Sequence, residues 1–106
     1  IFNQKKEFFV GFYLDSKNKI IAREIISIGT LNSSLVHPRE VFKSAIVRSA
    51  NSIILAHNHP SGDLSPSDED LRVTKILKDV GELLGIKILD HIIVSEKGFK
   101  SIIDEM

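Results

Sequence analysis

Two long apolar segments follow each other with almost no gap at the start of the chain, and this feature constrains the fold most. Residues 7–15 (EFFVGFYLD) and 19–29 (KIIAREIISIG) are rich in aromatic and β-branched residues, as strands are. Only residues 16–18 (SKN) separate them, and so short a connection joins antiparallel neighbours. The chain is therefore expected to begin with an antiparallel hairpin.

The rest of the sequence alternates helical and strand-like patterns. Pro38 suits the first position of a helix and Glu40 its positive end, and the apolar residues at helical spacing in that segment are Val41, Phe42, Ala45 and Ile46. Gly85 is a suitable C-terminal cap for a second helix. The predicted elements after the hairpin are a helix over 38–50, a strand over 52–59, a helix over 67–84, a strand over 86–94 and a short edge strand near 99–103. This order predicts an α/β (α+β) fold in which helices flank a mixed β-sheet.

Length and composition limit the classes of protein. The 106 residues suit a single domain spanning 1–106, and 14 basic residues balance 14 acidic ones. Zero net charge disfavours a domain whose main task is to grip nucleic acid. Cysteine is absent, so any metal must be held by His, Asp or Glu. No apolar run is long enough for a membrane span and no signal peptide is visible, so a cytoplasmic location is expected. A first residue other than methionine suggests part of a longer protein.

The densest group of polar residues is AHNHPSGDLSPSDED, residues 56–70. His57 and His59 are two apart at a predicted strand end, so both rings can point to one face. Pro60 ends the strand, Gly62 permits a sharp turn, and Asp70 falls on the first turn of the next helix. Two imidazoles and one carboxylate suit zinc or another first-row divalent ion, and three protein ligands leave a position for water.

A simpler interpretation of the same residues stays open. Ser67 is a good N-cap whose side chain could bond the amide of Asp70, and acidic residues are favoured at a helix start in any case. An isolated H-x-H pattern is also a weak signal. Spacing alone does not choose between a metal site and a polar loop with a capped helix.

The complete pattern resembles a known motif. H-x-H-P, six residues and S-x-x-D are matched by His57, His59, Pro60, Ser67 and Asp70 without departure. The pattern looks like the JAMM motif of the MPN-type metallopeptidases, and the segment HNHPSGDLSPSDEDLRVT is similar to the bacterial RadC family. GTLNSSLVHPREVF before the motif and LLGIKILDHIIVSEKGFKS after it extend the resemblance over nearly the whole chain.

The resemblance implies an MPN fold, similar to the cytidine-deaminase architecture, and a Zn²⁺ ion held by His57, His59 and Asp70. It implies that Ser67 stabilises the oxyanion and that an upstream glutamate moves a proton from zinc-bound water to the leaving amine. RadC-like chains usually carry an N-terminal helix-hairpin-helix region, and because this sequence shows none, it is expected to be part of a longer protein. The implied activity is hydrolysis of a peptide or isopeptide bond, with a peptide or protein as substrate.

The glutamate of the family motif precedes the first strand, and Glu7 occupies that place. Glu40 is a rival, although its helix-start position explains it, and Glu24 lies in the middle of a strand. Thr74, one turn after Asp70, is a weaker candidate that could bond the ligand carboxylate from behind.

Asp90 and His91 interrupt an apolar strand, and because neighbours on a strand face opposite sides only one of them can face the site. Either could fix the tautomer of a histidine, although a structural role is the simpler expectation.

Three functions therefore follow from the sequence. The first is a zinc-dependent hydrolase. The second is a DNA-repair-associated accessory domain, which the family name suggests but the neutral charge disfavours. The third is an MPN-type interaction scaffold with little activity, for which all five motif residues would not be needed. The sequence leaves the oligomeric state open, with a homodimer among the options.

Overall fold

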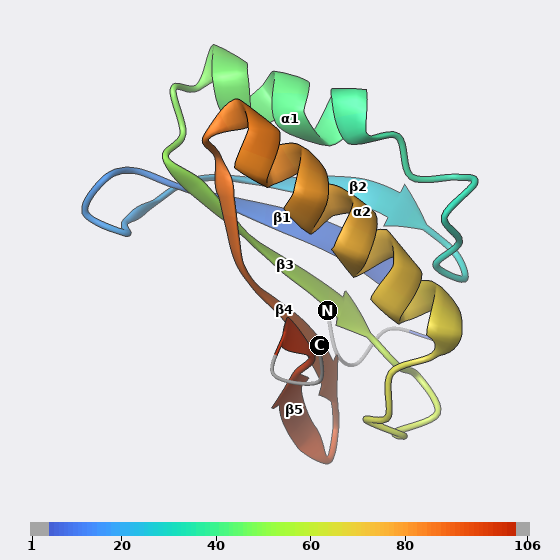
Figure 1. Cartoon of the computed structure of the whole chain (residues 1–106). Coiled ribbons are helices and arrows are strands. Elements are labelled where there is room, and N and C mark those ends of the chain that lie inside the picture. Colours follow the sequence, from blue (N-terminus) through green and yellow to red (C-terminus); the bar gives the residue numbers. More distant parts are fainter. Residues whose placement is uncertain (1–4, 104–106) are drawn as a thin grey trace.

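A computed structural model describes residues 5–103 and confirms the predicted α+β class. A mixed five-stranded sheet has the strand order β2-β1-β3-β4-β5, and two helices accompany it (Figure 1). Only β3 and β4 are parallel, and the other neighbours run antiparallel. The elements are β1 (Phe8–Leu14), β2 (Ile20–Ile28), α1 (Pro38–Val47), β3 (Ser52–Asn58), α2 (Asp68–Leu84), β4 (Lys87–Ser95) and β5 (Gly98–Ser101).

The predicted hairpin is confirmed by β1 and β2, which pair from Phe8 opposite Ile28 to Leu14 opposite Ile20. The Asp15 carboxylate accepts the backbone N–H groups of Lys17 and Lys19 at 2.8 and 2.9 Å, and Asn18 is left-handed with φ 63°. An Asx-type turn of this kind needs a short polar side chain, which the sequence supplies. The hairpin therefore places the start of β1 opposite the end of β2.

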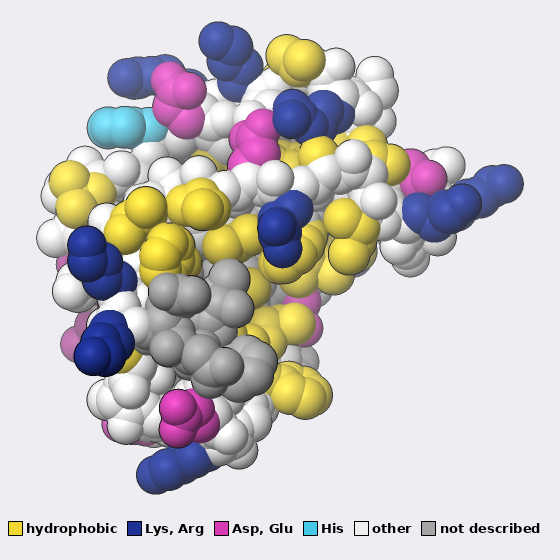
Figure 2. All heavy atoms as spheres, turned by 180° about the vertical axis from the view of Figure 1, so that it is seen from behind, with side chains coloured by type: hydrophobic (Ala, Val, Ile, Leu, Met, Phe, Trp, Pro, Cys, Tyr) yellow, Lys and Arg dark blue, Asp and Glu magenta, His cyan; other side chains and the backbone are white. Residues whose placement is uncertain are grey.

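The two faces of the sheet differ. Both helices pack on one face, where Phe9 and Tyr13 of β1 meet side chains of α1 and α2 in the hydrophobic core (Figure 1). Tyr13 also donates its hydroxyl hydrogen to the Val41 carbonyl of α1 at 3.1 Å. Figure 2 views the other side, where hydrophobic side chains gather on the surface; Ile25 and Ile28 of the edge strand β2 are each 58% exposed. The core therefore lies between the helices and one face of the sheet.

Helix α1 is shorter than predicted. It ends at Val47 rather than at residue 50, because Arg48 leaves helical geometry and Ser49 adopts a left-handed φ of 53°. Ile46, expected on the apolar face, is 59% exposed, whereas Phe42 and Ala45 are buried as predicted. The last predicted turn is therefore a connection to β3.

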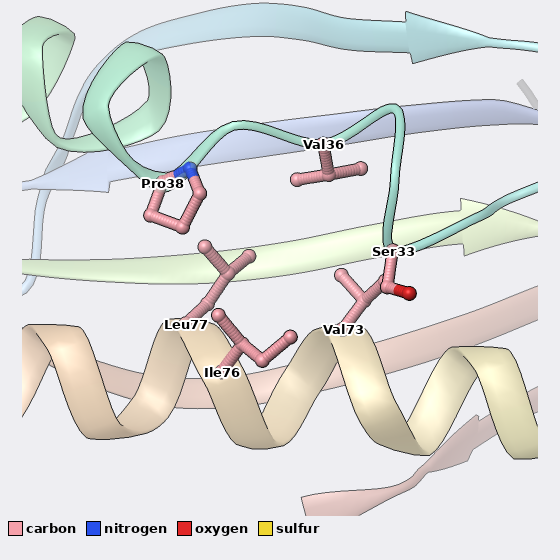
Figure 3. A pocket seen from close by; sticks show the side chains of 6 residues that line it. All are labelled: Ser33, Val36, Pro38, Val73, Ile76 and Leu77. Atoms are coloured by element: carbon pink, nitrogen blue, oxygen red, sulfur yellow. The ribbon is translucent and has the colours of Figure 1, made fainter.

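The segment between β2 and α1 packs against α2. Val36 and Pro38 contact Val73 and Leu77 of that helix around a small apolar hollow that leaves no space for a water molecule (Figure 3). The Ser33 N–H also donates to the Glu69 carboxylate at 2.9 Å. These contacts hold the β2–α1 segment beside the N-terminal end of α2.

Helix α2 ends as predicted at Gly85, which is left-handed with φ 73° and donates its N–H to the Gly81 carbonyl. Gly81 itself lies where the chain turns back against the helix. A Cβ atom built on Gly81 would lie 2.4 Å from the backbone oxygen of Ile86. Glycine is therefore required here by close approach, although alanine is the better helix former.

We expect the variant Gly81→Ala to lower the melting temperature. The added methyl group must displace backbone, and overpacking of this kind costs about 1–3 kcal/mol, or on the order of 5–20 °C for a domain of this size. Circular dichroism melts would measure it, with Glu82→Ala at the neighbouring exposed position as the control. A Gly81→Ala protein that melts with the wild type would contradict this account.

Candidate metal centre

Strand β3 and helix α2 bring the predicted ligands together. His57 is the penultimate residue of β3, His59 follows the strand, and Asp70 is in the first turn of α2. The His57 and His59 Nε2 atoms are 2.9 Å apart. Asp70 Oδ1 lies 3.3 Å from His57 Nε2, and Asp70 Oδ2 lies 3.2 Å from His59 Nε2. The ligand atoms of these three residues all lie within 4.8 Å of one another, as a single ion requires.

Ser67 and Asp70 also form the helix cap. The Asp70 N–H donates to Ser67 Oγ at 3.1 Å, and the Ser67 N–H donates to Asp70 Oδ2 at 2.8 Å. This capping box satisfies two backbone donors at the start of α2. The capped-helix and ligand-cluster interpretations of these residues are therefore compatible, because the cap fixes the carboxylate beside the histidines.

The charge on Asp70 follows from its surroundings. Burial acts to raise the pKa of the Asp70 carboxyl, but the adjacent His57 ring and the Ser67 N–H lower it, and the net pKa is well below its usual range. The carboxylate is consequently ionised at neutral pH, although the residue is only 3% exposed. A buried negative charge of this kind calls for a positive partner.

The arrangement of lone pairs at the cluster suits a cation. His59 Nδ1 lies 2.6 Å from the backbone carbonyl of Asp63, which can only accept, so Nδ1 carries the proton and Nε2 has a free lone pair. That lone pair is directed at His57 and at the Asp70 carboxylate. Two imidazole nitrogens and a carboxylate are ligands that zinc accepts, so the residues fit the metal that the motif implies.

The cluster opens to a cavity of about 240 Å³ between the β2–α1 segment and the loop before α2. Its lining joins parts of the chain far apart in sequence and includes both residues predicted to act in catalysis. The lining residues are Glu7, Thr30, Leu31, His59, Ser61, Asp63, Ser65, Ser67 and Asp70. A substrate group in this cavity would therefore meet two of the candidate ligands, a serine hydroxyl and a glutamate together.

Among the three glutamates considered from the sequence, Glu7 is the one that lines the cavity. It directly precedes β1, and its carboxylate accepts the Leu31 N–H at 3.1 Å. Glu24 instead contacts the Ser44 hydroxyl at 2.5 Å and Arg48 at 2.9 Å, and Glu40 is exposed near Arg39. The geometry therefore favours Glu7 over its rivals, and its catalytic role stays a prediction.

Thr74 is near the cluster but its contacts differ from the prediction. Its hydroxyl donates to the backbone carbonyl of Asp70 at 2.7 Å and lies 2.5 Å from His91 Nδ1, rather than bonding the Asp70 carboxylate. The reason is helical geometry, because residues four apart bring this hydroxyl to the preceding carbonyl.

His91 is one of the two residues that the sequence analysis considered for fixing the tautomer of a histidine, and it lies directly behind His57. Its Nε2 lies 2.7 Å from His57 Nδ1, and the side chain is fully buried. Burial, and then the nearby His57, lower the pKa of His91 to about 3, so the ring is neutral. Asp90 lies on the opposite face and accepts the Ser101 hydroxyl at 2.5 Å. The sequence signal for this role was the pair of adjacent polar residues, Asp90 and His91, in an otherwise apolar strand, because one of the two must face inward.

Fold and site together define a class: a small α+β domain with a buried His-His-Asp cluster at the mouth of a polar cavity. No helix within residues 5–103 is long and apolar enough to cross a membrane. The chain matches the sequence profile of the RadC-like JAB domain over residues 1–106, and it belongs to that family.

Curated relatives carry the name UPF0758 protein, which states no activity. The relative from Methanosarcina mazei is 59% identical over 102 residues, covering 96% of this chain and 44% of the relative. The relative from Finegoldia magna is 65% identical over 89 residues, covering 84% and 40%. That from Staphylococcus haemolyticus is 56% identical over 100 residues, covering 94% and 44%. The chain thus spans less than half the length of these relatives.

Proposed function

We propose that this domain is a zinc-dependent hydrolase that cleaves a peptide or isopeptide bond. The observation that carries the proposal is the cavity that His59 and Asp70, two members of the convergent His57, His59 and Asp70 cluster, share with Glu7 and Ser67. Glutamate and serine side chains beside such a cluster supply a proton carrier and a hydrogen-bond donor, which amide hydrolysis needs.

Each residue has a distinct task in this proposal. His57, His59 and Asp70 would hold the zinc ion, which when bound supplies Lewis acidity and lowers the pKa of a coordinated water to about 7. Glu7 accepts a proton from the attacking water and returns it to the leaving amine. The Ser67 oxygen already accepts the Asp70 N–H, so its hydroxyl hydrogen is available for the developing oxyanion.

The cavity also supports a peptide or protein partner over nucleic acid. Among residues 5–103, its lining carries three carboxylates, from Glu7, Asp63 and Asp70, and no lysine or arginine. Phosphate backbones are bound by basic surfaces, and the whole chain has zero net charge. The proposal also places the domain in the cytoplasm.

Zinc content is the first test of this function. We expect the chain, reloaded with zinc and freed of excess metal, to hold about one zinc ion, as a three-ligand site does. His59→Ala should hold little, because one of three ligands is gone. His37→Ala is the matched control, since His37 is exposed and makes no side-chain capping bond. Elemental analysis would measure the metal.

Hydrolysis is the second part of the test. The zinc-loaded chain would be screened against a peptide library and isopeptide-linked conjugates, with a chelator-treated sample alongside. Cleavage that disappears with the metal and in His59→Ala supports the proposal. A reloaded wild-type chain without zinc would overturn it, and zinc binding without cleavage of any amide would favour a scaffold.

A further inference from the structure

The ring of His57 has two nitrogens with different surroundings. Nε2 faces His59 and Asp70, whereas Nδ1 lies 2.7 Å from Nε2 of His91. A neutral imidazole carries one ring proton, so a nitrogen that offers its lone pair to a metal leaves the proton on the other. His57 must therefore carry its proton on Nδ1 in order to bind a metal through Nε2, and that N–H is aimed at His91.

His91 can accept this hydrogen bond only in one tautomer. Its Nε2 must present a lone pair, which places the ring proton on Nδ1. The ring is fully buried, so that N–H also needs an acceptor, and Thr74 Oγ1 lies 2.5 Å away. The tautomer of His91 therefore depends on which way the Thr74 hydroxyl points.

The backbone decides the direction of the Thr74 hydroxyl. Its oxygen is 2.7 Å from the Asp70 carbonyl, which has no hydrogen to give, so the hydroxyl donates to that carbonyl and accepts from His91. The contacts His57–His91, His91–Thr74 and Thr74–Asp70 are then each hydrogen bonds with one donated proton. The reverse assignment leaves two oxygens facing each other without a hydrogen, and it moves the His57 proton to Nε2, where the metal would bind.

We propose that Thr74 and His91 are positioning residues that hold His57 in the tautomer required of a metal ligand. The inference rests on the proposed zinc binding. The hydrogen bonds run from His57 through His91 and Thr74 to the backbone of Asp70, so two candidate ligands are joined behind the site. Partners of this kind orient a ligating histidine and raise its basicity.

The variant Thr74→Val tests the proposal because valine has nearly the same shape but no acceptor for the His91 N–H. We expect its zinc affinity, measured by competition with a chromogenic chelator, to fall about 10–100-fold, as for other losses of ligand support. Thr74→Ser keeps the hydroxyl and should restore the wild-type affinity. Melting curves of both variants in the metal-free state would show that each is folded.

Nitrogen NMR of the histidine rings shows which ring nitrogen carries the proton, and a role of His91 in packing alone would not determine that position. In the zinc-loaded wild type we expect His91 to be neutral with its proton on Nδ1. A proton on Nε2 of His91 would overturn the inference. If the wild type binds zinc and Thr74→Val binds it equally well, the inference about Thr74 and His91 is wrong and the proposed function stands. If the wild type takes up no zinc, both the inference and the proposed function are wrong.

Discussion

The variant Glu7→Gln is expected to lose hydrolysis while keeping its zinc. Glutamine has the size of glutamate and can still accept the Leu31 N–H, which now bonds the Glu7 carboxylate at 3.1 Å. It cannot take a proton at neutral pH, so the turnover number should fall by about 10²–10⁴-fold, the usual contribution of a general base. Turnover of a peptide from the screen would be measured beside zinc content.

Other glutamates provide the controls. Glu40→Gln removes an exposed carboxylate in α1 and should leave turnover unchanged. Glu24→Gln tests the mid-strand rival, whose carboxylate is held by Ser44 and Arg48. If Glu7→Gln retained full turnover, the assignment of the base would be wrong, and a loss in Glu24→Gln would point to a different proton carrier.

The second large effect is on stability. The Nε2 atoms of His57 and His59 and the Asp70 carboxylate come together only in the folded chain, so zinc binds that state in preference to the unfolded one. Zinc at 100 to 1,000 times its dissociation constant should stabilise the fold by about 2.7–4.1 kcal/mol. The melting temperature should then rise on the order of 10–30 °C, which scanning calorimetry would measure.

Asp70→Asn should remove most of this shift, because asparagine keeps the shape of the side chain and loses its charge. Asp79→Asn is the matched control, since Asp79 lies on the same helix, is exposed and pairs only with Lys75 in the described structure. A zinc-dependent shift of wild-type size in Asp70→Asn would show that the metal binds elsewhere. The absence of a shift in the wild type would argue against a zinc site altogether.

The ligand cluster was predictable because its geometry is local. Alternation along a strand places His57 and His59 near each other, and the short loop from Pro60 to Pro66 returns the chain to Asp70. The capping box depends only on Ser67 and the third residue after it. Patterns of this range are fixed by backbone periodicity and hydrogen bonding, which a sequence displays directly.

The role of His91 could not be predicted in the same way. Its contact with His57 depends on the parallel pairing of β3 with β4, where a register shift falls between Ile53 and Ile54. A shift of one residue exchanges the two faces of a strand, so the sequence could not say whether Asp90 or His91 faced inward. The family resemblance had already favoured Glu7 over Glu24, but the position of Glu7 at the cavity depends on tertiary pairing that the sequence does not display.

The predicted end of helix α1 was wrong, and the reason is a local backbone conformation. Arg48 and Ser49 carry no proline or glycine signal, yet Ser49 takes a left-handed φ of 53° that ends the helix before the chain enters β3. Without a proline or glycine, a sequence marks the end of a helix only to within one or two residues.

The double use of Ser67 and Asp70 affects how descendants of this chain would diverge. Because the two side chains cap α2, selection for folding alone would retain them after any loss of catalysis; replacing a cap costs about 1 kcal/mol. The presence of Ser67 and Asp70 in a related sequence is therefore only weak evidence that the related protein is active. His59 has no part in that cap, so selection for the cap would not retain it once a metal was no longer needed. Retention of that histidine is the better sign that selection still acts on the site.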